Sequence, residues 1–195
     1  MNKAQLKALL ENMKLNWADW EKADSPIGLF LEKLKIDDDY DEEQIRLIGM
    51  LLSKSVNTDK AQMFWEILDP ACTGKSGKEA FEALFSKLID LVGDKTYILV
   101  KGSNKKGEYD QVTDYCKNLT ETANIAKTKL ITSVFSSDEI TKVVFMEKFR
   151  ANQVEYGSMF SPKGLRAYLK KTYDETPANE KGSVAAVNDM FANFA

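Results

Sequence analysis

Apolar residues recur every three or four positions along most of the chain, which is the spacing of one face of an α-helix. In the first half the pattern predicts helices over residues 1–14, over about 58–68, and from Ser25-Pro26 onward. Two more helices are expected around Ile45–Leu52 and Phe81–Leu91. Proline suits the first turn of a helix, so the start at Ser25-Pro26 is the best marked of these.

At the start of the second half of the chain the helical spacing of apolar residues is interrupted. Residues 96–100 form a short β-prone run, and the glycine- and lysine-rich stretch after them is typical of a turn or linker. One long helix is predicted from about Tyr109 to Phe135, and two more are predicted to begin with caps at Ser137 and at Ser161-Pro162. Residues 174–182 are polar and are expected to form a loop.

These elements together predict an all-α protein built from two helical lobes. The N-terminal lobe is expected over residues 1–93 and the C-terminal lobe over 110–173, joined by a turn-rich linker over 94–109 that has room for a short hairpin. Residues 174–195 are predicted to be a tail that ends in a short amphipathic helix.

The chain contains no histidine among its 195 residues. This absence removes the commonest general base, the usual zinc ligand and every nucleophilic triad that depends on imidazole. Carboxylate and lysine chemistry stay open, but the composition predicts a protein that is not an enzyme and needs no cofactor. A formal net charge of -3, with arginine only at Arg46, Arg150 and Arg166, argues against nucleic acid as a partner.

The cysteines and apolar runs of the chain indicate a cytoplasmic protein. Cys72 and Cys116 lie far apart in no paired spacing, as free thiols of a reducing compartment do. No apolar run is long enough to span a membrane. Residues 1–14 also lack the apolar core and cleavage site of a signal peptide, and they include Glu11, which is unusual in a mitochondrial presequence.

Two helix starts carry the residues of a capping box, in which a capping side chain precedes Glu by three positions. One is Asp39 with Glu42, and the other is Ser76 with Glu79. The acidic run 37–43 is therefore interpreted as solvated carboxylates at the N-terminus of a helix, where the helix dipole favours negative charge. Binding of a divalent cation by this run is the alternative.

The segment around Gly74 has the framework of a known cation-binding unit. If Asp69 is the first position of a loop, Trp65 and Leu68 precede it as apolar anchors and Gly74 stands at the sixth position, where the chain must turn sharply. The helix that follows carries its anchors at Phe81, Leu84 and Phe85. In these features residues 58–92 resemble an EF-hand, the helix–loop–helix unit of the calmodulin superfamily.

The ligands of an EF-hand are missing from this loop. The family binds calcium through oxygens at loop positions one, three, five and nine and through a bidentate glutamate at position twelve. Here these positions hold Asp69, Ala71, Thr73, Gly77 and Ala80. Glu79 lies one residue early, so the degenerate loop of Asp69, Thr73 and Glu79 is predicted to bind no metal.

Two other segments also have features of the family. The acidic turn 37–41 is a candidate partner of the first loop, because EF-hands usually pair, although its residues fit no ligand pattern. Residues 137–172 resemble a second unit weakly, with a loop beginning near Gln153. Their apolar residues fall at family spacing: Phe149, Phe160, Leu165, Tyr168 and Leu169.

The resemblance implies two lobes whose grooves receive helices of partner proteins. We therefore expect a non-catalytic EF-hand-like scaffold or adaptor, independent of calcium, that is a structural component of a large intracellular assembly. Cytoskeletal or axonemal structures, including those of a cilium, are the preferred setting, and tubulin or other cytoskeletal proteins are the candidate partners. The main alternative is a calcium sensor or buffer with unconventional loops.

A third interpretation treats Asp69–Ser76 as a nucleotide site, because this stretch is one residue away from a P-loop. A P-loop needs glycine where Asp69 stands, and it must follow a buried strand. A nucleotide-binding enzyme is therefore the least favoured function.

Five apolar residues near the ends of the chain are candidates for partner binding, because terminal segments fray unless they dock. They are Trp17, Trp20, Met190, Phe191 and Phe194. Packing on the protein's own core is the alternative for each of them.

Overall fold

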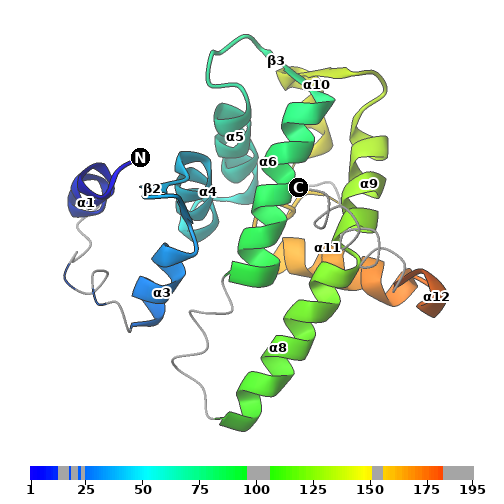
Figure 1. The fold of residues 1–195 in the computed structure, drawn as a ribbon. Coiled ribbons are helices and arrows are strands. Elements are labelled where there is room, and N and C mark those ends of the chain that lie inside the picture. The colour runs from blue at the N-terminus through cyan, green and yellow to red at the C-terminus, as the bar shows by residue number, and fades with distance from the viewer. Residues whose placement is uncertain (13–17, 19–21, 23–24, 96–105, 151–155, 182–195) are drawn as a thin grey trace.

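The computed structural model describes residues 1–12, 18, 22, 25–95, 106–150 and 156–181, and these residues are mostly helical (Figure 1). The described strands are short and form two antiparallel pairs. The predicted all-α class is therefore confirmed. No helix in the described part of the chain is long and apolar enough to cross a membrane.

The N-terminal elements are α1 (Lys3–Asn12), α3 (Pro26–Glu32), the hairpin of β1 (Lys35–Ile36) and β2 (Asp39–Tyr40), and α4 (Glu42–Leu52). Helix α3 starts where the sequence predicts, because the Ser25 side chain accepts a hydrogen bond from the Gly28 N–H at 2.9 Å. Leu6 and Leu10 give helix α1 its buried face.

The acidic run forms the turn and second strand of a hairpin, in which β1 pairs with β2 and not with the loop after Leu68. The chain turns back between β1 and β2 with Asp37 in the left-handed backbone conformation, at φ 57°. Helix α4 begins after the hairpin, and its cap is Asp41, whose carboxylate accepts from the N–H groups of Glu43 and Gln44. The prediction of Asp39 as the cap is therefore wrong, and so is the predicted pairing of this turn with the loop after Leu68.

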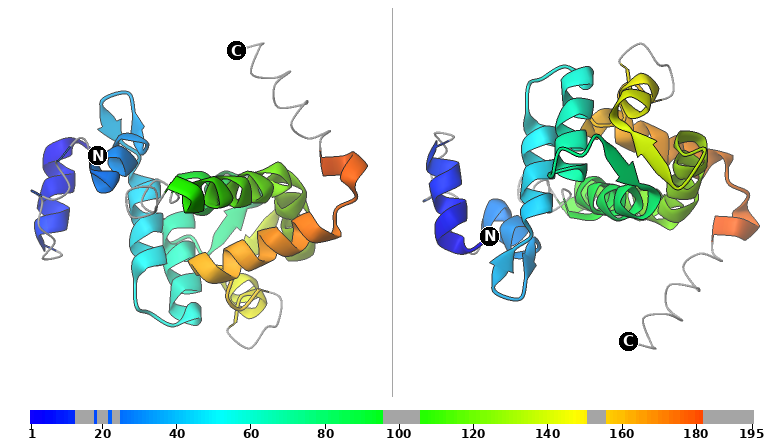
Figure 2. Two further views of the ribbon diagram at one scale, coloured as in Figure 1. Left: turned by 90° about the horizontal axis from the view of Figure 1, so that it is seen from below. Right: turned by 90° about the horizontal axis from the view of Figure 1, so that it is seen from above.

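The central helices form two helix–loop–helix units. The first consists of α5 (Asn57–Leu68), β3 (Lys75–Gly77) and α6 (Lys78–Asp90), and the second of α9 (Ala123–Val134), β4 (Glu139–Thr141) and α10 (Lys142–Lys148). Strands β3 and β4 pair in antiparallel fashion, with Ser76 opposite Ile140 at the middle of the register, and Figure 2 shows them side by side. The pairing therefore joins one unit from each half of the chain.

Three helix boundaries in this region differ from the prediction. The long helix expected over 109–135 is two helices, α8 (Lys106–Glu121) and α9, which are separated at Thr122. Helix α10 begins after a cap at Thr141 and not at Ser137. Helix α6 follows Gly77 without a side-chain cap, so the predicted capping box of Ser76 and Glu79 is absent.

The last described helices are α11 (Pro162–Glu175) and α12 (Ala178–Lys181). Helix α11 starts as predicted, because the Ser161 side chain accepts a hydrogen bond from the Gly164 N–H at 3.0 Å. The loop predicted over 174–182 is instead largely helical in its described residues. A π-helical turn, η1 (Leu91–Lys95), follows α6 where the sequence predicts a helix end near Gly93.

Phenylalanine rings form the centre of the hydrophobic core. The ring centroids of Phe64 and Phe160 lie 4.4 Å apart, and those of Phe145 and Phe149 lie 4.7 Å apart. The fully buried rings are Phe64, Phe81, Phe85, Phe145, Phe149 and Phe160. Because these rings come from both predicted lobes, the two halves of the chain share one core.

Candidate functional site

Asp69 stands at the end of α5, and its carboxylate is engaged by its own loop. Oδ1 accepts hydrogen bonds from the N–H and the hydroxyl of Thr73, both at 2.9 Å, and Oδ2 accepts one from the N–H of Gly74 at 2.7 Å. The bond from the Thr73 N–H, aided by that from Gly74, holds the pKa of Asp69 below its usual range. The negative charge of this side chain therefore already has its partners inside the loop.

The backbone of this loop turns through two residues in the left-handed conformation, Cys72 at φ 56° and Gly74 at φ 76°. Glycine adopts this conformation without strain, which explains why it suits the sharp turn predicted at Gly74. The Cys72 N–H donates to the Asp69 carbonyl at 3.1 Å and closes the first part of the turn. The shape of the loop is thus set by its own hydrogen bonds.

The other candidate ligands do not gather around Asp69. The Thr73 hydroxyl lies 2.9 Å from Asp69 Oδ1 and 3.0 Å from the Lys75 carbonyl oxygen, so it is used within the loop. Glu79 is exposed in the first turn of α6. No group of three or more acidic or cysteine side chains in the described ranges is placed to hold a metal ion. Because calcium takes six to eight oxygen ligands, the donor set of this loop does not fit it.

The first N–H group of each exiting helix is bonded to the opposite loop. Lys142 opens α10, and its N–H donates to the Gly74 carbonyl at 3.0 Å. Lys78 opens α6, and its N–H donates to the Asp138 carbonyl at 2.8 Å. The charge of Lys142 also contributes to lowering the pKa of Asp69. A lysine of the second unit therefore supplies positive charge close to the first loop.

The opposite loop runs from Phe135 to Thr141 and begins with an aromatic residue in place of a carboxylate. The ring of Phe135 lies 5.3 Å from that of Phe81 in the core. Ile140, in β4, is 4% exposed and belongs to the hydrophobic core. We call residues 69–77 and 135–141, joined by β3 and β4, the loop pair. Its second member has Phe135 at the start, where the first member has Asp69.

Residues after α10 pack on the aromatic core and on the helices around it. Phe160 follows α10 in the sequence, and its ring stacks on Phe64. Helix α11 packs against α8, α9 and η1, and its Tyr168 hydroxyl donates to the Ala126 carbonyl at 2.9 Å. Two leucines of α11 are fully buried: Leu165 and Leu169. These buried side chains tie α11 to the helices around it, and the expected groove for a helix of a partner protein stays a prediction.

The structure brings Asp69 and Thr73 together and leaves Glu79 apart from them. Trp65 is 2% exposed, and its ring lies 5.1 Å from that of Phe145, so it is a core residue. The five candidates for partner binding all lie outside the described residues and stay predictions: Trp17, Trp20, Met190, Phe191 and Phe194.

The sequence reasoning missed the loop 135–141 as the companion of the first loop. It placed the second loop near Gln153, which lies outside the described residues. The available signal was Ile140, one apolar residue flanked by polar ones immediately before a helical pattern. This alternation is typical of a short strand with one buried face.

No family model, no curated protein and no solved structure matches the chain.

Proposed function

We propose that this chain is an EF-hand-like protein in which a hydrogen-bonded loop pair replaces calcium binding, and that it acts as a non-catalytic scaffold or adaptor for other proteins. One observation carries the proposal. The Asp69 carboxylate accepts three hydrogen bonds from Thr73 and Gly74, at the loop position where an EF-hand directs a carboxylate to calcium. The antiparallel contact of β3 with β4 supports the same reading, because it joins two helix–loop–helix units through their loops.

The filled interior supports a permanent state over a calcium switch. Calcium sensors of this superfamily open a pair of helices and expose an apolar groove for their targets. Here the ring centroids of Phe160 and Phe64 lie 4.4 Å apart and Phe160 is 2% exposed, so separating the two units would expose the aromatic core. The proposed scaffold therefore binds its partners through its outer surface, in contrast to the groove binding that the sequence led us to expect.

The two alternative functions have less support. A calcium sensor would need Asp69 to give up its bonds to Thr73 and Gly74, and Ala71 and Gly77 would still offer no side-chain oxygen. A nucleotide site needs a buried strand before the loop, whereas the residues before Asp69 form helix α5.

Isothermal titration of the full chain with calcium tests the loss of cation binding. We expect no saturable heat up to about 1 mM calcium, the weak end of the range for EF-hand-type sites. The thermal unfolding midpoint is expected to be the same in calcium and in a chelator. Saturable binding at micromolar calcium would contradict the proposal.

A variant that restores the missing ligands tests the EF-hand likeness itself. Ala71→Asp, Gly77→Asp and Ala80→Glu together supply carboxylates at loop positions three, nine and twelve. Ala71 and Ala80 are exposed, and a Cβ at Gly77 would come no closer than 3.9 Å to Asp138, so the changes fit the fold. We expect the triple variant to gain calcium binding. A triple variant that folds but binds no calcium would count against the family proposal.

Cross-linking mass spectrometry in native extract tests the scaffold role. We expect reproducible cross-links from exposed lysines to a small set of partner proteins. A chain recovered only as a free monomer, without such cross-links, would contradict this part of the proposal.

A further inference from the structure

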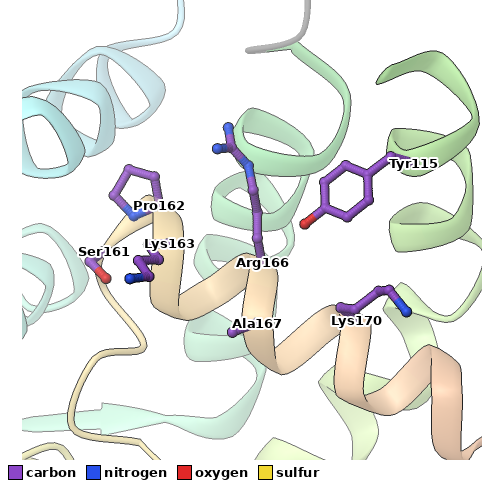
Figure 3. A pocket seen from close by; sticks show the side chains of 7 residues that line it. All are labelled: Tyr115, Ser161, Pro162, Lys163, Arg166, Ala167 and Lys170. Atoms are coloured by element: carbon purple, nitrogen blue, oxygen red, sulfur yellow. The ribbon is translucent and has the colours of Figure 1, made fainter. Parts of the chain in front are cut away.

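A cleft of about 600 Å³ lies along helix α11, facing α8 (Figure 3). Its apolar lining is formed by Tyr115, Pro162 and Ala167, and its charged lining by Lys163, Arg166 and Lys170. Figure 3 shows Tyr115 reaching from α8 toward the side chain of Arg166. The cleft is large enough for a few side chains of a bound segment.

The charges of the cleft are all positive. Lys163, Arg166 and Lys170 follow one another along one face of α11, because residues three and four apart in a helix are neighbours. Among the residues that the structure describes along the cleft none is a carboxylate, although the chain as a whole has a net charge of -3. Lys170 does pair with Asp174 one turn farther along the helix, at 2.5 Å. An occupant of this cleft should therefore combine carboxylates with an apolar side chain.

The tip of the β1–β2 hairpin has this combination. Ile36 is 60% exposed, and the three residues that follow it, Asp37, Asp38 and Asp39, are exposed carboxylates. An exposed isoleucine beside three acidic residues is complementary in charge and polarity to the cleft. The hairpin and helices α8 and α11 lie apart in every view of the molecule (Figures 1 and 2). One copy therefore cannot place its hairpin in its own cleft.

We propose that the hairpin tip of one copy binds in the α8–α11 cleft of a second copy, so that the chain associates head to tail. Ile36 would lie against Tyr115 and Pro162, while the aspartates face Lys163 and Arg166. Such a contact joins two different surfaces and can continue from copy to copy. For its role in an assembly this inference rests on the proposed scaffold function, but its test involves neither calcium nor a partner protein.

The contact should be weak and sensitive to salt. Exposed ion pairs contribute little individually, and salt screens them. We therefore expect the weight-average mass in sedimentation equilibrium to rise over about 1 µM to about 1 mM chain, a range that brackets weak association. The rise should be larger at low than at high ionic strength.

A charge swap gives the decisive experiment. Asp37→Lys with Asp38→Lys makes the hairpin positive, and Lys163→Glu with Lys170→Glu makes the cleft negative. Each double variant alone should associate at least about fivefold more weakly than the parent, because like charges now face each other. An equal mixture of the two should recover the association, because each altered surface meets its complement.

Matched controls separate the contact from general charge effects. Lys54→Glu with Lys171→Glu changes the net charge by the same amount as the cleft variant at exposed lysines outside the cleft lining, and should leave association unchanged. Ile36→Ser should weaken association, whereas Val56→Ser, at a residue 65% exposed, should not. Circular dichroism verifies that each variant is folded. The proposal would be overturned if the parent stays monomeric or if either double variant alone associates like the parent. It would also be overturned if the mixture of the two double variants does not associate.

Discussion

Replacing Phe160 by alanine tests whether the chain fills the space between its own helix–loop–helix units. Phe160 is 2% exposed, and its ring centroid lies 4.4 Å from that of Phe64 and 4.8 Å from that of Phe149. Truncating a buried phenylalanine to alanine costs about 3–5 kcal/mol of unfolding free energy, through lost burial and the cavity left behind. Because rigid rings surround the site, the cavity cannot collapse easily, and we expect about 4–5 kcal/mol.

The assay is urea unfolding followed by far-ultraviolet circular dichroism, with thermal unfolding as a second measurement. In a chain of this size the expected loss corresponds to a fall in Tm of roughly 8–20 °C. Val143→Ala is the control, because Val143 is 69% exposed and its truncation should change the free energy by less than about 0.5 kcal/mol. A loss of under about 1 kcal/mol for Phe160→Ala would mean that the site is open, and that a groove for a partner helix exists after all.

Four further substitutions test single positions. Gly164→Ala should destabilise the protein, because a Cβ there would lie 2.0 Å from the Ser158 carbonyl oxygen. Gly49→Ala should stabilise helix α4 by about 0.5–1 kcal/mol, because a Cβ at Gly49 would have nothing within 4 Å. Urea unfolding measures the change in unfolding free energy for both variants. Burial alone would raise the pKa of Asp41, but the hydrogen bond from Lys87 at 2.7 Å and those from Gln44 outweigh it and hold the pKa below its usual range. A carboxylate with a lowered pKa stabilises the fold above its unfolded pKa and loses this contribution as pH falls through its folded value. Asp41→Asn should therefore cost about 1–2 kcal/mol at pH 7 and less below about pH 4, and an equal cost at both would refute the role of the charge. Asp69→Ala should lower the Tm, because the bonds to Thr73 and Gly74 are lost, and differential scanning fluorimetry should show that the variant remains insensitive to calcium.

The sequence predicts most helices of this fold because their signals are local. Ser25-Pro26 and Ser161-Pro162 mark helix starts through a cap and a proline, and both starts are confirmed. The helix over 58–68 is confirmed as α5 because its apolar residues follow one face. Local cap and period signals do not depend on the rest of the fold, and this is why they succeed.

The errors arise where distant contacts decide the structure. No glycine or proline marks the break between α8 and α9, where Thr122 is fully buried and its hydroxyl has no hydrogen-bond partner in the described residues. Ser76 fits a capping box by spacing, but pairing with Ile140 places it in a strand instead. The companion of the first loop was missed for the same reason, since two loops far apart in sequence meet only through the tertiary fold.

The loop pair is held by hydrogen bonds within the first loop and between the two loops. In a calcium-binding loop the cation offsets several carboxylates, and its coordination orders the backbone. In the first loop of this chain Asp69 is the one carboxylate, and its charge is met by N–H groups and by the nearby Lys142. The first N–H groups of α6 and α10, which a helix leaves unpaired, bond to the opposite loops.

In the loop pair the Asp69 carboxylate and the first N–H groups of α6 and α10 thus have hydrogen-bond partners within the protein. On the proposed function, the geometry of the loop pair would not depend on calcium concentration. The outer surface of the protein would then keep one conformation, with the ring of Phe160 stacked on Phe64 in the aromatic core. On the proposed function, association is then governed by the concentration of partners and by exposed contacts such as the hairpin tip at Ile36, because the interior provides no switch.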